Sequence, residues 1–451
     1  MSALTRSKLT IAISFISTLV ALGLITGCGT GLVTGNSPIA VPPVASVGGR
    51  IQGSAHGGQQ PVYGATIQLY AVTTGGYFAP ATSLLTTPVI TASDGTFSIT
   101  GDYSCTGVDQ VYVVAIGGNP GLPGNINNGS LALMAALGTC STLKANASTT
   151  FINMNEVTTV AGAWALAQFM TSPTNAGTSA SNVTGLENAF ITASKISNIS
   201  TGNAPGPALP AGATLPIAEI NTLADILSTC VNSNGSTASG SACGSLFTAA
   251  TPPGGVAPAD TLTAALNIAR NPANNVSALF ALSAARADFQ PTLSVTPASW
   301  LIGIRHTGGG LAQPTAVAID AAGNVWAANA ANSVSEFSPA GAALAPNSGY
   351  TAGSLSSPSA IAIDLSGNAW VTNLTGSITR LAPLGASATN YTAGGLSQPV
   401  GIAIDGSGNV WIANNGNGSV SGLTSSGSVI TGTPYSGAGI NAPSGIAVSA
   451  H

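Results

Sequence analysis

Hydrophobic and polar positions repeat along the last third of the chain with a long, regular period. Short apolar runs alternate with small and polar residues in three copies, at 313–329, 357–373 and 398–414, and a fourth copy begins at Ala442. Short apolar runs bounded by polar turn residues predict short strands that are covered on both faces. Several such strands in each copy of a period near forty residues indicate a radially repeated β-sheet.

Each copy has the same turn signature between its first two predicted strands. An aspartate is followed by glycine three residues later, then by asparagine, and a tryptophan comes two residues after the asparagine. The members are Asp320, Gly323, Asn324 and Trp326, then Asp364, Gly367, Asn368 and Trp370, then Asp405, Gly408, Asn409 and Trp411. An Asp carboxylate accepts backbone N–H bonds across a turn, while Gly and Asn tolerate positive φ, so the signature predicts a β-hairpin. One indole at a fixed place in every copy predicts rings that pack between neighbouring sheets.

A third strand is expected in each copy, and other elements are expected earlier in the chain. Alternation at 65–71 predicts a half-buried strand, and the continuous apolar run at 111–116 predicts a central strand. Between residues 127 and 290 the periodicity becomes helical, and Asn155 can cap a helix that begins at Glu156. The expected third strands are 333–337, 377–381 and 419–423, and the expected helices are 156–169, 182–196, 217–231, 260–269 and 275–283.

Two of these segments resemble known families. The repeats, over 291–451, resemble the NHL-type β-propeller repeat of bacterial surface proteins and streptogramin lyases. Residues 47–126 resemble the carboxypeptidase regulatory-like domain, which implies a small transthyretin-like β-sandwich. The fold class is therefore expected to be multidomain, mainly β with a helical domain at 127–290. Closed propellers have about four to eight blades, so three copies and the start of a fourth predict either a truncated chain or an open arc.

The first residues predict export. Basic Arg6 and Lys8 precede an apolar stretch at 9–25, which is typical of a secretory signal peptide covering residues 1–27. The sequence Ile-Thr-Gly-Cys that ends at Cys28 resembles a bacterial lipobox, which implies lipidation of Cys28 and a membrane anchor. The uncharged Gly/Pro/Ser-rich segment 28–46 would then be a tether, and the residue after the cysteine implies sorting to the outer membrane. The alternative is an uncleaved membrane-spanning anchor.

Cysteine and charge counts restrict the possible partners. Cys105, Cys140, Cys230 and Cys243 form an even set, which in an exported chain predicts two disulfides with three possible pairings. Proximity along the chain favours Cys105–Cys140 and Cys230–Cys243. Neither pair has CxxC spacing and the chain has 3 histidines, so no metal site is expected. The net charge of −4 provides no basic patch and excludes nucleic acid as a partner.

Candidate catalytic groups are few. His56 lies in a glycine-rich loop, His306 takes the position that tyrosine fills before the other copies, and the repeated aspartates fit turns better than metal ligation. The sequence therefore predicts no catalytic, cofactor-binding or metal residue. The leading hypothesis is a non-catalytic cell-surface or periplasmic lipoprotein that binds a protein or a glycan, or that serves as an envelope spacer. The alternative is a streptogramin-lyase-like enzyme, whose family uses paired histidine and acidic residues around a metal. The candidates here would be His306, Glu336 and the turn aspartates.

Overall fold

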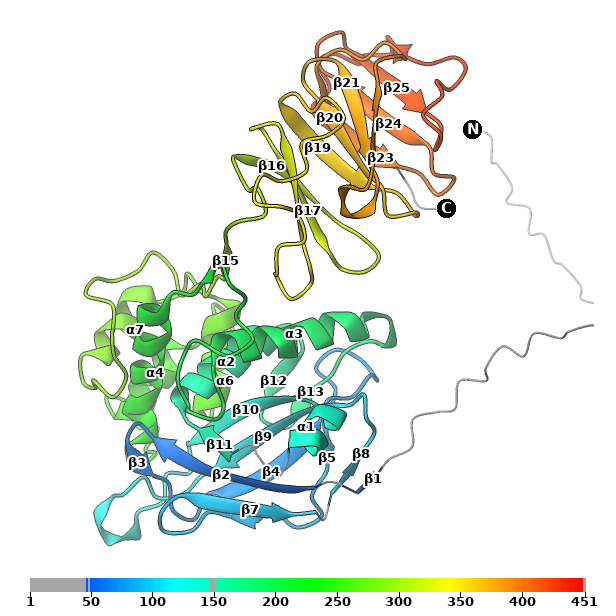
Figure 1. Ribbon diagram of the computed structural model, residues 1–451. Helices are drawn as coiled ribbons and strands as arrows, with labels where there is room; N and C mark the ends of the chain where they lie inside the picture. Colours follow the sequence, from blue (N-terminus) through cyan, green and yellow to red (C-terminus); the bar gives the residue numbers. More distant parts are fainter. Residues whose placement is uncertain (1–45, 48, 102, 147–150, 449–451) are drawn as a thin grey trace, which may run out of the picture. The chain divides into compact units, whose positions relative to one another are not determined.

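The computed structural model describes residues 46–448, except 48, 102 and 147–150. The predicted signal peptide, Cys28 and nearly all of the predicted tether lie outside the described residues. Within the described part, the fold is mainly β, with several open sheets and seven α-helices (Figure 1). No helix in this part is long and apolar enough to span a bilayer.

The first half of the chain builds two sheets. One has the strand order β10-β9-β4-β5, with β6 also paired to β4, and its strands are β4 Thr66–Ala71, β5 Thr82–Ser83, β6 Val89–Ile90, β9 Gln110–Ile116 and β10 Ala132–Thr139. The other has the order β11-β2-β3, with β7 paired to β2, and its strands are β2 Arg50–Gly57, β3 Gln60–Pro61, β7 Thr96–Thr100 and β11 Phe151–Met154. All pairings are antiparallel except that of β11 with β2. A short ribbon joins β1 Ser46–Val47 to β8 Ser104–Cys105.

One apolar core lies between these two sheets. Ile67 and Val113 of the first sheet share it with Ile99 and Ile152 of the second. The half-buried strand predicted at 65–71 is confirmed, because exposure alternates along β4, and β9 is central as predicted. The boundary expected at residue 126 falls between two strands, β9 and β10, that pair with each other along their length.

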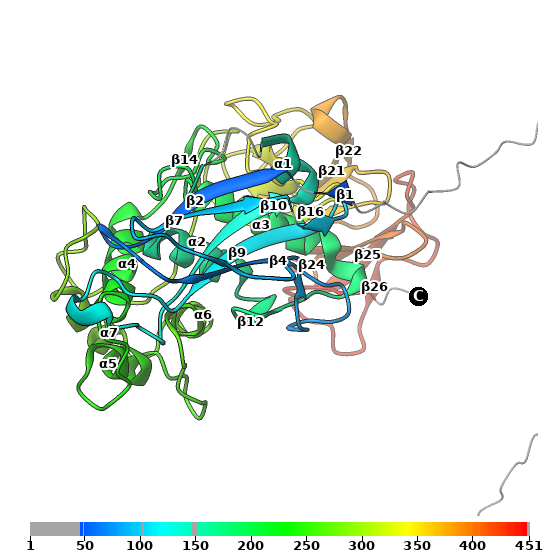
Figure 2. The ribbon, with the colours of Figure 1, turned by 90° about the horizontal axis from the view of Figure 1, so that it is seen from below.

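Helices cover the other face of the first sheet (Figures 1 and 2). Tyr112 and Met134, on β9 and β10, pack into one large core with side chains from α2, α3, α4 and α6. The helices are α1 Cys140–Asn146, α2 Glu156–Leu166, α3 Val183–Ile196, α4 Ile217–Val231, α5 Ala242–Ala249, α6 Thr261–Arg270 and α7 Val276–Ser283. The short pieces between them are β12 Met170–Ser172, β13 Asn175–Ala176, η2 Ala180–Asn182 and β14 Ala213–Thr214, which pairs with β15 Arg305–His306. A further short piece, η1 Pro123–Asn125, lies between β9 and β10.

Five helices were predicted from the sequence, and all five are present. The Asn155 side chain accepts a bond from Thr158 N at 3.1 Å, so the predicted cap at the start of α2 is confirmed. That helix ends at Leu166, three residues before the predicted end at 169, because Phe169 N bonds Leu166 O and turns the chain. Helices α1 and α5, of seven and eight residues, were not predicted.

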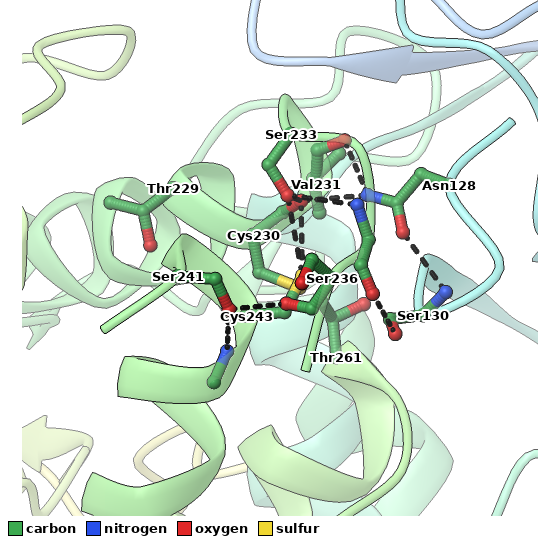
Figure 3. The surroundings of a disulfide bond; sticks show 12 residues. Asn128, Ser130, Thr229, Cys230, Val231, Ser233, Ser236, Ser241, Cys243 and Thr261 are labelled. Carbon is green, nitrogen blue, oxygen red and sulfur yellow. Dashed lines mark hydrogen bonds between the residues drawn. A yellow bond between two sulfur atoms is a disulfide. The ribbon is translucent and has the colours of Figure 1, made fainter. Parts of the chain in front are cut away.

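The four cysteines form the two disulfides that chain proximity favours, Cys105–Cys140 and Cys230–Cys243. The second disulfide joins the last turn of α4 to the first turn of α5 (Figure 3). Asn128 lies beside it and donates from Nδ2 to the carbonyl oxygens of Cys230 at 2.7 Å and Val231 at 3.0 Å. These bonds satisfy carbonyls that the end of a helix leaves without an intrahelical partner.

The repeats form three similar sheets, which we name blades. Blade 1 contains β16 Pro314–Ile319, β17 Val325–Asn329 and β18 Ser333–Phe337. Blade 2 contains β19 Pro358–Ile363, β20 Ala369–Asn373, β21 Ser377–Leu381 and β22 Ala388–Tyr391, with η3 Pro383–Gly385 before its last strand. Blade 3 contains β23 Pro399–Ile404, β24 Val410–Asn414, β25 Ser419–Leu423 and β26 Tyr435–Ser436. The predicted third strands are confirmed with the bounds expected from the sequence.

Candidate functional site

The repeated turn aspartates are fully engaged inside their own blades. In blade 2, Oδ1 of Asp364 accepts backbone bonds from Ser366 and Asn368, both at 2.9 Å. Oδ2 accepts from Asn368 Nδ2 at 2.8 Å and from Trp370 Nε1 at 2.9 Å. Burial alone would raise the pKa of Asp364, but the bonds from Trp370 and Asn368 bring it below its ordinary value. Asp320 and Asp405 have the same set of bonds.

Two of the three repeated tryptophans lie between blades. Trp326 and Trp370 are fully buried, and each belongs to an apolar cluster that continues into the next blade. Trp411 of blade 3 is only partly buried. Each indole also packs on the tyrosine that follows the third strand of its blade, with ring centroids 5.4 Å apart for Trp370 and Tyr391. The indoles of Trp326 and Trp370 therefore each join three elements: the turn of their own blade, the tyrosine of their own blade and the next blade.

A second repeated polar network was not predicted from the sequence. Asn329, Asn373 and Asn414 each end the second strand of a blade, and all three are fully buried. In blade 2 the Asn373 amide donates to Ser377 Oγ at 3.1 Å and Thr379 Oγ1 at 3.0 Å, and its oxygen accepts from Ser356 N at 3.0 Å. The signal was present in the sequence, because an asparagine recurs three residues after each repeated tryptophan.

The tyrosine before each of the later copies belongs structurally to the preceding blade. Tyr391 pairs with Ile378 as the outer strand of blade 2, and Tyr435 pairs with Val420 in blade 3. These rings also contact the following blade. A Cβ on Gly427 of blade 3 would overlap the ring of Tyr391. Gly385 lies in the same way against Tyr350, and Gly341 against His306. A glycine with positive φ therefore receives each ring, at φ 83° for Gly341, 65° for Gly385 and 88° for Gly427.

We expect Gly427→Ala to lower the free energy of unfolding by about 2 kcal/mol, since it combines a left-handed backbone with overlap of the Tyr391 ring. Gly432→Ala is the matched control, because Gly432 has a similar φ of 90° but open space around its Cβ direction. It should cost about 1 kcal/mol, the backbone contribution alone. Denaturant unfolding of both variants measures the difference. Equal losses would contradict the docking of the ring on Gly427.

His306 and Glu336, which the lyase resemblance offers as candidates beside the turn aspartates, do not form a catalytic pair. Glu336 is buried, and its Oε2 accepts a bond from Tyr350 Oη at 2.9 Å. Burial raises the pKa of Glu336, and the Tyr350 bond opposes this rise. His306 pairs with Ala213 and packs against Phe337, and burial together with the charge of Lys195 lowers its pKa. Each group therefore has structural contacts in or beside blade 1.

A buried acidic cluster lies outside the blades, and the sequence did not indicate it. Both carboxylate oxygens of Glu156, which is fully buried, accept from Gly58 N at 3.0 Å. Asp225, also fully buried, accepts backbone bonds from Asp288 and from Phe289, and Asp288 forms an ion pair with Arg286 at 2.7 Å. Burial raises the pKa of Glu156 to about 8 and that of Asp225 to about 6. Within the described residues, no group of three or more histidine, cysteine or acidic residues could hold a metal ion.

Comparison with known protein families finds a match for one of the three copies. Residues 396–423 match the NHL repeat. No curated protein matches the chain. Among solved structures, the catalytically inactive virginiamycin B lyase of Staphylococcus aureus with quinupristin is 20% identical at a TM-score of 0.25, over 31% of this chain and 46% of that one.

Two further structures have similar values. The selenomethionine-substituted lyase of the same organism is 21% identical with a TM-score of 0.25, over 31% of this chain and 50% of that one. A nidogen/laminin complex is 19% identical with a TM-score of 0.24, over 28% and 49%. The chain thus spans half or less of the length of these structures. The matched stretch contains the turn and the tryptophan of blade 3, which identifies the third copy as an NHL repeat.

Proposed function

We propose that the chain is an exported, lipid-anchored protein without catalytic activity, whose NHL-type repeats bind or scaffold a partner. The observation that carries this proposal is that the repeated aspartates are already engaged in hydrogen bonds inside their own blades. The carboxylates of Asp320, Asp364 and Asp405 each accept bonds from their own turn and indole. A carboxylate engaged in this way is not available as a general base or as a metal ligand.

Exposed apolar side chains, at positions that differ among the three copies, suggest where a partner would bind. Leu365 is 89% exposed and Leu384 is 63% exposed. They belong to neighbouring turns of blade 2, since a Cβ on Gly367 in the first turn would lie 3.4 Å from Pro383 in the second. Exposed apolar side chains that lie together are typical of interaction sites. The partner would be a protein or a glycan with an apolar face.

The proposal assigns residues 47–126 the role of a spacer. Two sheets pack face to face around one core, as in the transthyretin-like sandwich that the sequence resembles, although β10 and β11 from beyond residue 126 complete them. Modules of this kind in exported proteins usually act as spacers or binding domains rather than as catalysts. Lipidation of Cys28 would then hold the whole chain at a membrane surface.

Three measurements test the proposal. Metabolic labelling with an alkyne fatty acid should mark the protein, and Cys28→Ser should abolish the label. Glycan and peptide arrays probed with the purified chain should give binding that Leu365→Glu reduces, whereas Val256→Glu, a change at another exposed apolar residue, should not. The protein should not linearise quinupristin in the presence of Mg²⁺. Turnover of quinupristin that disappears in His306→Ala would instead support the lyase-like alternative.

A further inference from the structure

A polar cavity lies beside the buried acidic cluster, at the turn of the β2–β3 hairpin. Its volume is about 290 Å³, and its lining includes His56, Gln59, Thr201, Asn203 and Phe289. These residues come from the hairpin, from the loop after α3 and from the segment after α7. Elements distant in the sequence therefore converge on one small space, which is the usual arrangement of a ligand site.

Several polar groups on this lining have no protein partner. In the part of the chain that the structure describes, the side chains of His56, Thr201 and Asn203 make no hydrogen bond. Gln59 uses its amide nitrogen only for a contact of 3.5 Å with Asp288 O, and its carbonyl oxygen has no partner. A hydroxyl, two amides and an imidazole are thus available to a ligand.

Hydrogen bonds from Asn153 and Asn155 hold the loop that carries Thr201 and Asn203. Asn155 Nδ2 donates to Gly202 O at 2.9 Å, and Asn153 N donates to Ile199 O at 2.7 Å. Gly202 has a φ of 72°, and a Cβ there would lie 2.6 Å from Asn155 Nδ2. The two asparagines thus fix the backbone of the loop, so the loop itself needs little ordering when a ligand binds.

The chemistry of the lining selects a neutral ligand. Charged side chains are absent from the described lining, so an anion or a cation would find no direct ion pair there. Burial lowers the pKa of His56, with Asp94 opposing it, so the neutral imidazole is favoured. Neutral imidazole, amide and hydroxyl groups both donate and accept, as sugar hydroxyls do, and Phe289 supplies one apolar wall.

We propose that this cavity binds one neutral sugar unit through His56, Gln59, Thr201 and Asn203. Its volume lies at the small end of the range of ligand pockets, which fits a single ring. The site is separate from the blades, so it does not depend on the function proposed for them. A sugar here would contact the helical side of the chain and the hairpin together.

Saturation-transfer NMR and calorimetric titration of the purified full chain with glucose, galactose and N-acetylglucosamine test the proposal. At least one of these sugars should bind with a dissociation constant of about 1 mM, and glucuronate and inorganic phosphate should bind more weakly. Asn203→Ala should weaken sugar binding about tenfold, the effect of losing one or two hydrogen bonds. Asn127→Ala is the matched control, because Asn127 is also exposed but does not line the cavity, and it should leave affinity unchanged.

Thr201→Val provides a second variant, which removes a hydroxyl at an exposed position without changing the volume of the side chain. It should also weaken sugar binding. The proposal fails if none of the three sugars binds at about 20 mM, or if phosphate or glucuronate binds more tightly than they do. It also fails if both lining variants fold and bind sugar as the unchanged chain does.

Discussion

Trp370→Ala is expected to lower the free energy of unfolding by about 4 kcal/mol. The indole is fully buried and packs with Ile378 of its own blade and with Val410 and Ile412 of the next. Its removal leaves a cavity between two blades and deprives Asp364 of the bond from Nε1 at 2.9 Å. It also removes the ring on which the Arg380 guanidinium lies, 5.4 Å from the centroid. Denaturant unfolding followed by far-UV circular dichroism measures the loss.

Trp411→Ala is the matched control. Trp411 makes the same bond to its turn aspartate, at 2.9 Å to Asp405, and packs on Tyr435 with centroids 6.3 Å apart. It differs in being only partly buried, so we expect a loss of about 2 kcal/mol. If the two variants lose equal stability, packing between blades is not what the tryptophan contributes. Trp370→Phe separates the two effects further, because it retains an aromatic ring and removes the N–H donor.

The repeats were predicted well from the sequence because their local chemistry and their packing agree. The Asp-x-x-Gly-Asn signature specifies a turn within five residues, and the apolar runs on either side specify strands. Both signals are local and occur three times, so each copy supports the interpretation of the others. The burial of Trp326 and Trp370 was predicted in the same way, because one large aromatic ring in every period has to be buried.

The boundaries between blades were harder to predict from the sequence. In the sequence an aromatic residue precedes each copy, and in the structure Tyr391 and Tyr435 form the outer strands of the preceding blades. Spacing in the sequence is the same for either assignment, so a period alone cannot decide where a blade begins. The decision comes from hydrogen bonds between strands about a dozen residues apart, such as those joining Ile378 and Tyr391.

The buried acidic cluster and the cavity beside it could not have been predicted. Glu156 was recognised only as a favourable residue in the first turn of a helix, and its partner Gly58 is almost a hundred residues away. Nothing in the local sequence distinguishes an exposed glutamate at this position from a fully buried one. His56 and Asn203 likewise meet only because two sheets and a helical layer bring their loops together.

The pH dependence of stability should reveal Glu156. Its pKa is raised from 4.5 to about 8, first by burial and then by the charge of Asp288, while the Gly58 bond and Arg286 oppose the rise. The folded chain therefore binds the Glu156 proton more tightly than the unfolded chain does. The stability that this proton contributes is fully present below pH 4.5 and is lost as the pH rises through about 8.

Glu156→Gln should remove this dependence, because glutamine has the shape of the protonated acid and does not ionise. Relative to the unchanged chain, the variant should gain about 3 kcal/mol of stability between pH 5 and pH 8. Any structural cost of the substitution is the same at both pH values and cancels in that comparison, as do contributions from Asp225 and Glu219. Urea unfolding of both proteins at pH 5 and pH 8 provides the measurement. A stability difference that stays constant between the two pH values would show that Glu156 is already ionised in the folded chain at pH 5, and its burial would then be offset by contacts stronger than the single Gly58 amide.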